Sequence, residues 1–474
     1  MAGTTYQIAV DGFGASRGNI QLTLNLTPNV FTGDAGDNVL NGTPIANIFI
    51  GSAGNDIING DTGTDTADYS SLGQAITLKP TGILIKGGGL GEDNLNSIER
   101  IIGTFGLANT IDTSEILDPT ININVNLGSN NLTVNGAGLS NPSFTIINFL
   151  NVIGTAGSDS INGNNVNNIL SGGAGTDVLN GRTGADSLNG GVGNDTYFVD
   201  NLGDVVTEGF NQGVDLVNSS VTYTLGANQE NLTLTGGASI NGTGNNLSNR
   251  ITGNIGVNIL NGGTGRDTLV GGGSNDTYFV DNILDVVTEG ANQGVDLVNS
   301  SVNYTLGANQ ENLTLTGNGN RNGTGNTLNN RITGNNGSNT LSGGVGNDTI
   351  IGGGGNDTII GGAGNDSLTG GTGNDTFRFN SSSEKIDRIT DFSVVNDTIA
   401  IRGVGFGGGL VVGILPTTRF KIGSSATTST QRFFYNSGSG GFFFDVDGSG
   451  ATAAVQIATL NTGLALTNQD ILVV

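Results

Sequence analysis

The sequence predicts an all-β solenoid: short strands stacked in turns, with β-rich spacers between blocks of repeats and a β cap at the C-terminal end. Glycine supplies 84 of the 474 residues and proline only 6, which fits neither average usage of roughly 7% glycine nor proline-rich collagen. Hydrophobic residues make up 35% of the chain, whereas disordered segments are poor in them. These apolar residues recur at one fixed position of a nine-residue unit, which indicates a repeat architecture.

The nine-residue unit reads Gly-Gly-x-Gly-x-Asp-x-U-x, where U is a large apolar residue. It occurs 19 times in four blocks, 33–68, 154–198, 244–279 and 325–378, and Ala67 is the one exception at the eighth position. Glycines supply positive φ angles in a tight turn, and the apolar residue of the following strand faces inward. Two units therefore close one flattened turn, and residues two units apart lie side by side.

The remaining segments are predicted to extend the β structure. Residues 69–153 form a β-rich spacer with alternating apolar and polar residues, and 379–474 form a C-terminal cap with aromatic strands. The spacers 199–243 and 280–324 are nearly identical at an offset of 81 residues, which is nine units and indicates a tandem duplication. Residues 1–32 are expected to form a leading β-hairpin segment.

Aspartate at the sixth position is the candidate metal ligand. Stacking places Asp348 near Asp366 and Asp357 near Asp375, so that carboxylates face carboxylates on two edges. Without a cation, their mutual repulsion should leave the array loose or unfolded. Calcium accepts six to eight oxygen ligands in a flexible geometry, whereas magnesium requires a tight octahedron. Carboxylates and glycine-turn carbonyls therefore predict calcium binding.

Composition excludes several other classes. The net charge of −24 repels phosphates and anionic membrane surfaces, so no nucleic-acid partner is expected. No run of about 18 apolar residues occurs, so no membrane span is expected. The chain has no histidine and no cysteine, which removes histidine triads, imidazole-held zinc and cysteine nucleophiles. We therefore predict that the chain is not an enzyme and has no catalytic residues.

Residues 343–378, GGVGNDTIIGGGGNDTIIGGAGNDSLTGGTGNDTFR, resemble the RTX or haemolysin-type calcium-binding repeat. The resemblance implies a right-handed parallel β-roll in which calcium is held between turns by the aspartate of one unit, the aspartate two units on, and turn carbonyls. Carried over by position, it implies the metal ligands Asp348, Asp357, Asp366, Asp375, Asp159, Asp177, Asp186 and Asp195. Weaker matches in the other two blocks are Asp56, Asp65, Asp267 and Asp276.

Seven units carry asparagine in place of the sixth-position aspartate. They are Asn38, Asn47, Asn168, Asn249, Asn258, Asn330 and Asn339. Asparagine keeps the turn-forming amide and loses the charge. These units are predicted to extend the solenoid with weak calcium binding or none.

The two chain ends carry further resemblances. The C-terminal region, ending Asp470-Ile-Leu-Val-Val, is similar to the cap and uncleaved signal of type I secretion substrates. This implies passage through a type I secretion apparatus, an extracellular or cell-surface location, and folding on extracellular calcium. Thr5–Leu26 is similar to the last strands of a bacterial pre-peptidase C-terminal domain. Two alternatives remain open: the non-catalytic C-terminal portion of a larger secreted hydrolase such as a protease, or a self-associating cell-surface structural protein.

Overall fold

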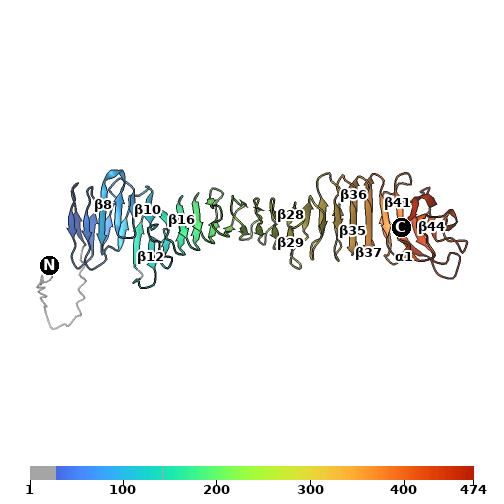
Figure 1. Cartoon of the computed structure of the whole chain (residues 1–474), viewed down its shortest axis with the longest axis horizontal. Helices are drawn as coiled ribbons and strands as arrows, with labels where there is room; N and C mark the ends of the chain where they lie inside the picture. The colour runs from blue at the N-terminus through green and yellow to red at the C-terminus, as the bar shows by residue number, and fades with distance from the viewer. Residues whose placement is uncertain (1–27, 141) are drawn as a thin grey trace, which may run out of the picture. The chain divides into compact units, whose positions relative to one another are not determined.

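The computed structural model describes residues 28–140 and 142–474, so the segment Thr5–Leu26 lies outside the described residues. The chain divides into two compact units, Met1–Val217 and Asn218–Val474. Each unit is a stack of short, mostly parallel strands (Figure 1). The predicted all-β fold is therefore confirmed as a parallel β-solenoid of the β-roll type.

The first unit consists of two sheets and the turns that join them. One sheet has the order β1 (Asn29–Thr32), β3 (Asn47–Ile50), β5 (Thr66–Asp68), β9 (Arg100–Ile102), β13 (Ser143–Ile147), β12 (Asn131–Asn135), β11 (Asn122–Asn126), β15 (Ser160–Asn162), β17 (Val178–Asn180) and β19 (Thr196–Val199). The other has the order β2 (Val39–Asn41), β4 (Ile57–Asn59), β8 (Gly91–Asn96), β7 (Ile83–Lys86), β6 (Ile76–Leu78), β10 (Asn109–Asp112), β14 (Phe149–Ile153), β16 (Ile169–Ala174), β18 (Ser187–Val192) and β20 (Val205–Thr207). β21 (Leu216–Ser219) spans the division between the units.

The second unit continues the same construction. One sheet contains β23 (Asn231–Leu234), β25 (Arg250–Thr252), β27 (Thr268–Val270) and β29 (Val286–Thr288). The next has the order β22 (Tyr223–Thr224), β24 (Gly242–Thr243), β26 (Ile259–Asn261), β28 (Thr277–Val280), β30 (Leu297–Ser300), β32 (Asn312–Leu315), β34 (Arg331–Thr333), β36 (Thr349–Gly354), β38 (Ser367–Thr372), β40 (Asp387–Ile389), β46 (Val455–Thr459), β45 (Gly441–Phe444), β44 (Phe433–Asn436) and β43 (Phe420–Ile422). The third has the order β31 (Tyr304–Thr305), β33 (Asn322–Thr324), β35 (Thr340–Val345), β37 (Thr358–Ala363), β39 (Thr376–Phe379), β41 (Thr398–Ile401), β47 (Ile471–Val473) and β42 (Gly413–Ile414).

The helices are short. They are α1 (Gly403–Phe406) and the 3-10 turns η1 (Gly87–Gly89), η2 (Thr417–Arg419) and η3 (Asn468–Asp470). Over residues 28–140 and 142–474, none of the helices has the length and hydropathy needed to cross a membrane.

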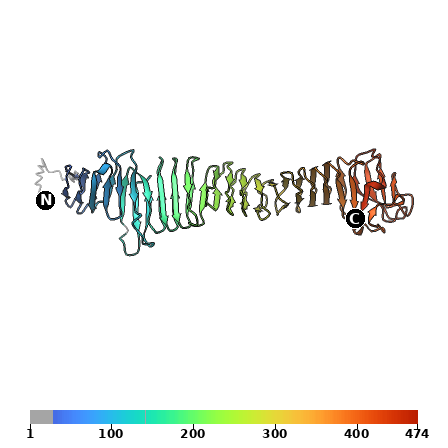
Figure 2. The same cartoon turned by 45° about the horizontal axis from the view of Figure 1, so that its top comes forward.

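The core of each unit is the column of eighth-position apolar residues. In the first unit Ile161 pairs with Leu179, and Leu179 with Tyr197, at spacings of 18 residues. In the second unit Ile350 pairs with Leu368 at the same spacing. All five side chains are buried, and each such burial stabilises the fold by about 1.5–3 kcal/mol. The stacked parallel strands that carry them are visible within each unit in Figure 2.

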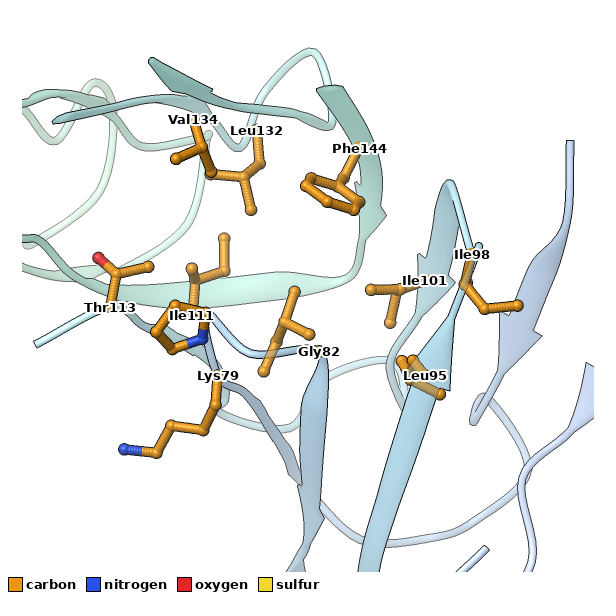
Figure 3. A pocket seen from close by; sticks show the side chains of 12 residues that line it. Lys79, Gly82, Leu95, Ile98, Ile101, Ile111, Thr113, Leu132, Val134 and Phe144 are labelled. Carbon is orange, nitrogen blue, oxygen red and sulfur yellow. The ribbon is translucent and has the colours of Figure 1, made fainter. Parts of the chain in front are cut away.

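Residues 69–153 widen the solenoid with antiparallel strands. β7 pairs antiparallel with both β6 and β8, and β12 pairs antiparallel with both β11 and β13. The widened section encloses a small apolar cavity of about 60 Å³, lined by residues that include Leu95, Ile111, Leu132 and Phe144 (Figure 3). This segment is therefore a rearranged part of the solenoid, and it brings new side chains to the edge of the first block.

Candidate metal centre

The sixth-position aspartates form hydrogen-bonded ladders along the edges of the solenoid. In the fourth block, the backbone N–H of Asp348 donates to Asp366 Oδ1 at 2.8 Å, and that of Asp357 to Asp375 Oδ1 at 2.8 Å. In the second block the N–H of Asp177 donates to Asp195 Oδ1 at 2.8 Å. In each of these carboxylates Oδ1 thus accepts the backbone N–H of the aspartate one solenoid turn earlier. This bond leaves Oδ2 available for another donor or for a cation.

That second oxygen, Oδ2, is buried and has no hydrogen-bond partner in ten aspartates of the described chain. They are Asp65, Asp177, Asp186, Asp195, Asp267, Asp276, Asp348, Asp357, Asp366 and Asp375. All ten are among the twelve aspartates that the sequence predicts as ligands. A buried carboxyl oxygen without a partner is costly, so a whole series of them fits the binding of cations.

The other two predicted ligands have partners within the protein. The hydroxyl of Ser52 donates to Asp56 Oδ2 at 3.1 Å. The backbone N–H of Thr155 donates to Asp159 Oδ2 at 2.6 Å. The hydroxyl of Thr155 also donates to this oxygen, at 3.2 Å. Ser52 and Thr155 occupy the second position of their units, so this position separates the two groups of aspartates.

The backbone at the second position explains the separation. In the ten units whose aspartate Oδ2 has no hydrogen-bond partner, the second-position residue has a φ between 63° and 109°. We call these units open turns. The second-position residues are Asp61, Gly173, Arg182, Gly191, Gly263, Gly272, Gly344, Gly353, Gly362 and Gly371. A left-handed residue reverses the direction of its peptide groups, and glycine adopts this conformation without steric cost.

In the asparagine units the second residue does not have a positive φ, and we call these units closed turns. Its N–H points into the turn, as where Asn326 donates to Asn330 Oδ1 at 2.8 Å. In the second, third and fourth blocks the asparagine amide then donates to a carbonyl one turn earlier: Asn339 Nδ2 bonds Arg321 O at 2.7 Å, and Asn258 Nδ2 bonds Ile240 O at 2.6 Å. These closed turns therefore stack on the preceding turn through neutral hydrogen bonds, while the asparagine N–H donates to the aspartate of the following turn, as Asn339 does to Asp357 Oδ1. Weak calcium binding there stays a prediction.

In the fourth block, the first glycines of two open turns, Gly343 and Gly352, each border a cradle of oxygens. A Cβ built on Gly343 would overlap Asp348 Oδ2 and would lie 2.6 Å from the carbonyl oxygen of Gly361. A Cβ on Gly352 would likewise overlap Asp357 Oδ2 and the carbonyl oxygen of Gly370. A carboxylate oxygen and a carbonyl oxygen of the next turn thus converge where only glycine leaves space. These hard oxygen donors fit calcium.

The raised pKa values of the buried ladder aspartates also favour cation binding. Burial raises the pKa of Asp348 and of Asp357 to about 6. Burial also raises the pKa of Asp177 to about 8, and the charges of Asp159 and Asp195 add to this rise. Near neutral pH the fold therefore holds carboxylates whose charge is uncompensated, and a bound cation would favour the ionised form.

In the second, third and fourth blocks the ladders run on to carboxylates outside the nonapeptide units, which the sequence does not predict as ligands. Their Oδ1 atoms accept the amide of the last nonapeptide aspartate. They are Asp204, Asp215, Asp285, Asp296, Asp387 and Asp397. Asp204 and Asp285 lie 18 residues after Asp186 and Asp267, so extending the register would have found them. The other four follow at 20 to 22 residues because loops interrupt the period.

Glutamates complete two of these ladder ends. Asp276, Glu289 and Asp296 place carboxylate oxygens within 4.8 Å of one another, and all three residues are buried. The hydroxyl of Tyr278 donates to Glu289 Oε1, while Glu289 Oε2 has no hydrogen-bond partner within the described residues. The first member of the duplication repeats this group as Asp195, Glu208 and Asp215.

Comparisons with known proteins agree with this geometry. The model of the RTX calcium-binding nonapeptide repeat matches residues 29–67, 151–178, 162–197, 171–205, 243–281, 324–359 and 351–381. No curated protein matches the chain significantly.

Two solved structures are similar to parts of the chain. The AlgE6R3 subunit of the mannuronan C5-epimerase from Azotobacter vinelandii is 28% identical over 31% of this chain and 78% of its own, with a TM-score of 0.21. The extracellular lipase LipA from Serratia marcescens is 15% identical over 56% of this chain and 45% of its own, with a TM-score of 0.19.

Proposed function

Because this chain is built on RTX calcium-binding nonapeptide repeats, we propose that it is a secreted β-roll protein that folds when its open turns bind extracellular calcium. The observation that carries the proposal is the set of ten buried aspartates whose Oδ2 atoms have no partner in the described chain. We assign the protein a structural, calcium-binding role and no catalytic residues.

The ligands would come from consecutive turns of one ladder. Asp348 and Asp366 lie one solenoid turn apart, as do Asp357 and Asp375. The carbonyl oxygens of the first-position glycines Gly361 and Gly370 converge on the same space. Bound calcium would supply the positive charge that neutralises these negatively charged carboxylates. The chain's own part is to hold the oxygens in register through the ladder of amide hydrogen bonds.

Coupling to folding follows from mass action. A site that exists only in the folded state stabilises that state by about 2.7 kcal/mol when calcium exceeds the dissociation constant about 100-fold. Sites along one ladder share carboxylates, and neighbouring turns share apolar cores, so binding at one turn favours the next. The array should therefore switch between loose and folded states over a narrow range of calcium concentration.

A calcium titration followed by circular dichroism tests this coupling. We expect β-sheet signal to appear cooperatively as calcium replaces a chelator in the full-length protein. Magnesium is the matched control, because it requires tight octahedral geometry and should not substitute. Equal β-sheet signal in excess chelator and in millimolar calcium would refute calcium-coupled folding.

Secretion through a type I apparatus is the second part of the proposal. In the folded state the residues that resemble a C-terminal signal are part of the cap: Ile471 and Val473 are buried in β47, which pairs with β41. Asp470 accepts the backbone N–H of Thr467 at 2.6 Å. A signal of this kind is exposed only in the unfolded chain, which fits export at low calcium followed by folding outside. Deleting residues 471–474 should abolish export from a host that carries such an apparatus, while an internal β-strand deletion of equal length should not.

A further inference from the structure

A buried cation of the protein itself, supplied by the spacer 69–153, lies against the first block. Lys86, the last residue of β7, is fully buried through its side chain. Its Nζ donates to the carbonyl oxygen of Gly54 at 2.7 Å and to Asp93 Oδ1, and it lies 3.6 Å from Asp56 Oδ2. The ammonium group therefore contacts two carboxylates and one turn carbonyl.

These two carboxylates are consecutive members of a ladder. The backbone N–H of Asp56 donates to Asp93 Oδ1 at 3.0 Å, which is the bond that joins Asp348 to Asp366 in the fourth block. Gly54 is the fourth-position glycine of its unit. The ammonium group of Lys86 thus lies among the same kinds of oxygen, aspartate carboxylates and turn carbonyls, that line the open turns.

The antiparallel insertion explains how the lysine reaches this place. β8 pairs parallel with β4, Ile58 with Leu95, and so takes the place in the stack that a repeat unit would otherwise take. Asp93 then stands where the sixth-position aspartate would stand. β7 folds back onto β8 and pairs Lys86 with Gly91, two residues from Asp93, so that the lysine side chain reaches Asp93. The hydroxyl of Tyr69 donates to Asp93 Oδ2 at 2.6 Å and satisfies its second oxygen.

We propose that Lys86 replaces the metal ion at this rung: it holds Asp56 and Asp93 together at any calcium concentration, and its removal creates a calcium site. The first part stands on the contacts of Lys86 alone. The second part rests on the proposed function, because it takes the open turns to be calcium sites. The rung formed by β4 and β8 is accordingly the part of the array that stays ordered before calcium arrives.

Hydrogen exchange on the full-length wild-type protein tests the first part. Amides of β4 and β8 should be protected equally in excess chelator and in calcium, whereas those of β36 and β38 should be protected only in calcium. Calcium-dependent protection of β4 and β8 would overturn the role of Lys86. If β36 and β38 were insensitive to calcium while β4 and β8 stayed protected, the proposed function would fail and this part would stand.

Substitution of the lysine tests both parts. In chelator, K86A and K86M should each lose protection at β4 and β8 by about 100-fold or more, as expected when a buried ion pair loses one partner. In calcium, K86A should regain protection and bind one more calcium ion than the wild type. K86M should not regain it, because the thioether chain fills the space without a charge.

K79A is the matched control, since Lys79 pairs with Asp112 and Glu115 at a partly exposed site nearby. It should behave as the wild type in both conditions. Wild-type protection of K86A in chelator would overturn the first part. Lost protection that calcium does not restore would overturn the second, provided that β36 and β38 of the same sample are protected in calcium.

Discussion

Replacing Asp357 by asparagine should change stability in opposite directions with and without calcium. The substitution keeps the shape of the side chain, and its Oδ1 can still accept the N–H of Asn339, now at 2.7 Å. The new amide would stand in the place of Oδ2, which converges with the carbonyl oxygen of Gly370 at Gly352. D357N therefore exchanges a buried charge for a hydrogen-bond donor that faces an acceptor.

The magnitude in the absence of calcium follows from the pKa of this carboxyl. Burial raises the pKa of Asp357 from 3.8 to about 6, which corresponds to about 3 kcal/mol of destabilisation when the group is ionised above that pH. Removing the charge should recover about this amount as an upper bound. In calcium the same substitution removes a ligand, and one weakened site costs about 2.7 kcal/mol where calcium exceeds the dissociation constant about 100-fold.

Hydrogen exchange at β36 and β37 measures both effects locally, which matters because a long repeat array need not unfold as one unit. Exchange should slow in chelator and speed up in calcium. D118N, the same chemical change at an exposed aspartate, should alter neither. Faster exchange of D357N in chelator would show that the buried charge does not destabilise the calcium-free fold. Unchanged exchange in calcium would exclude Asp357 as a ligand.

Three further predictions concern pH, a turn glycine and a ladder end. The folded pKa of Asp177, about 8, lies above that of an ordinary carboxyl. The calcium-free fold therefore binds the extra proton and should gain stability as pH falls from about 8 to about 5, which an increase of β-sheet signal in chelator over this range would show by circular dichroism. Gly353 has a φ of +104°, so an alanine there would be strained by about 1–3 kcal/mol. G353A should therefore lower the melting temperature of the calcium-bound protein. An unchanged melting temperature would argue against the left-handed turn. In E289Q the side chain can still accept the hydroxyl of Tyr278, but the group that it forms with Asp276 and Asp296 loses one negative charge. Calorimetry should therefore show weaker calcium binding at that rung. Undiminished affinity would exclude Glu289 as a calcium ligand.

The nine-residue spacing of the repeat was enough to predict most of the fold from the sequence. An apolar residue every nine positions, with glycine at the start of each unit, predicts strands that pair at 18 residues, and Ile161 with Leu179 does so. Where the register is interrupted, prediction loses its basis. The 20-residue step from Asp195 to Asp215 leaves the ladder intact but breaks the spacing that would have identified its last member.

Lys86 marks the limit of sequence reasoning at the site. It lies 30 residues after Asp56, in a segment without the repeat, and nothing in its neighbourhood along the chain indicates a buried cation. Only the pairing of β7 with β8, and of β8 with β4, brings it onto the ladder. Long-range strand pairing of this kind depends on the three-dimensional path of the insertion, which alternating apolar residues alone do not specify.

The second position of the unit carries as much information about calcium as the aspartate itself. Asp159 has the consensus acid, yet Thr155 at its second position supplies a backbone amide and a hydroxyl to the carboxylate. Asp186 has arginine there instead of glycine, and Arg182 still adopts a φ of 63°, so Oδ2 of Asp186 lacks a hydrogen-bond partner within the described chain. We therefore expect a calcium ligand where a carboxylate belongs to a turn whose second residue does not donate its own N–H to that carboxylate. On this argument T155G should convert the Asp159 turn into an open one and add a calcium site, and equal calcium stoichiometry in T155G and the wild type would refute the role of the second position.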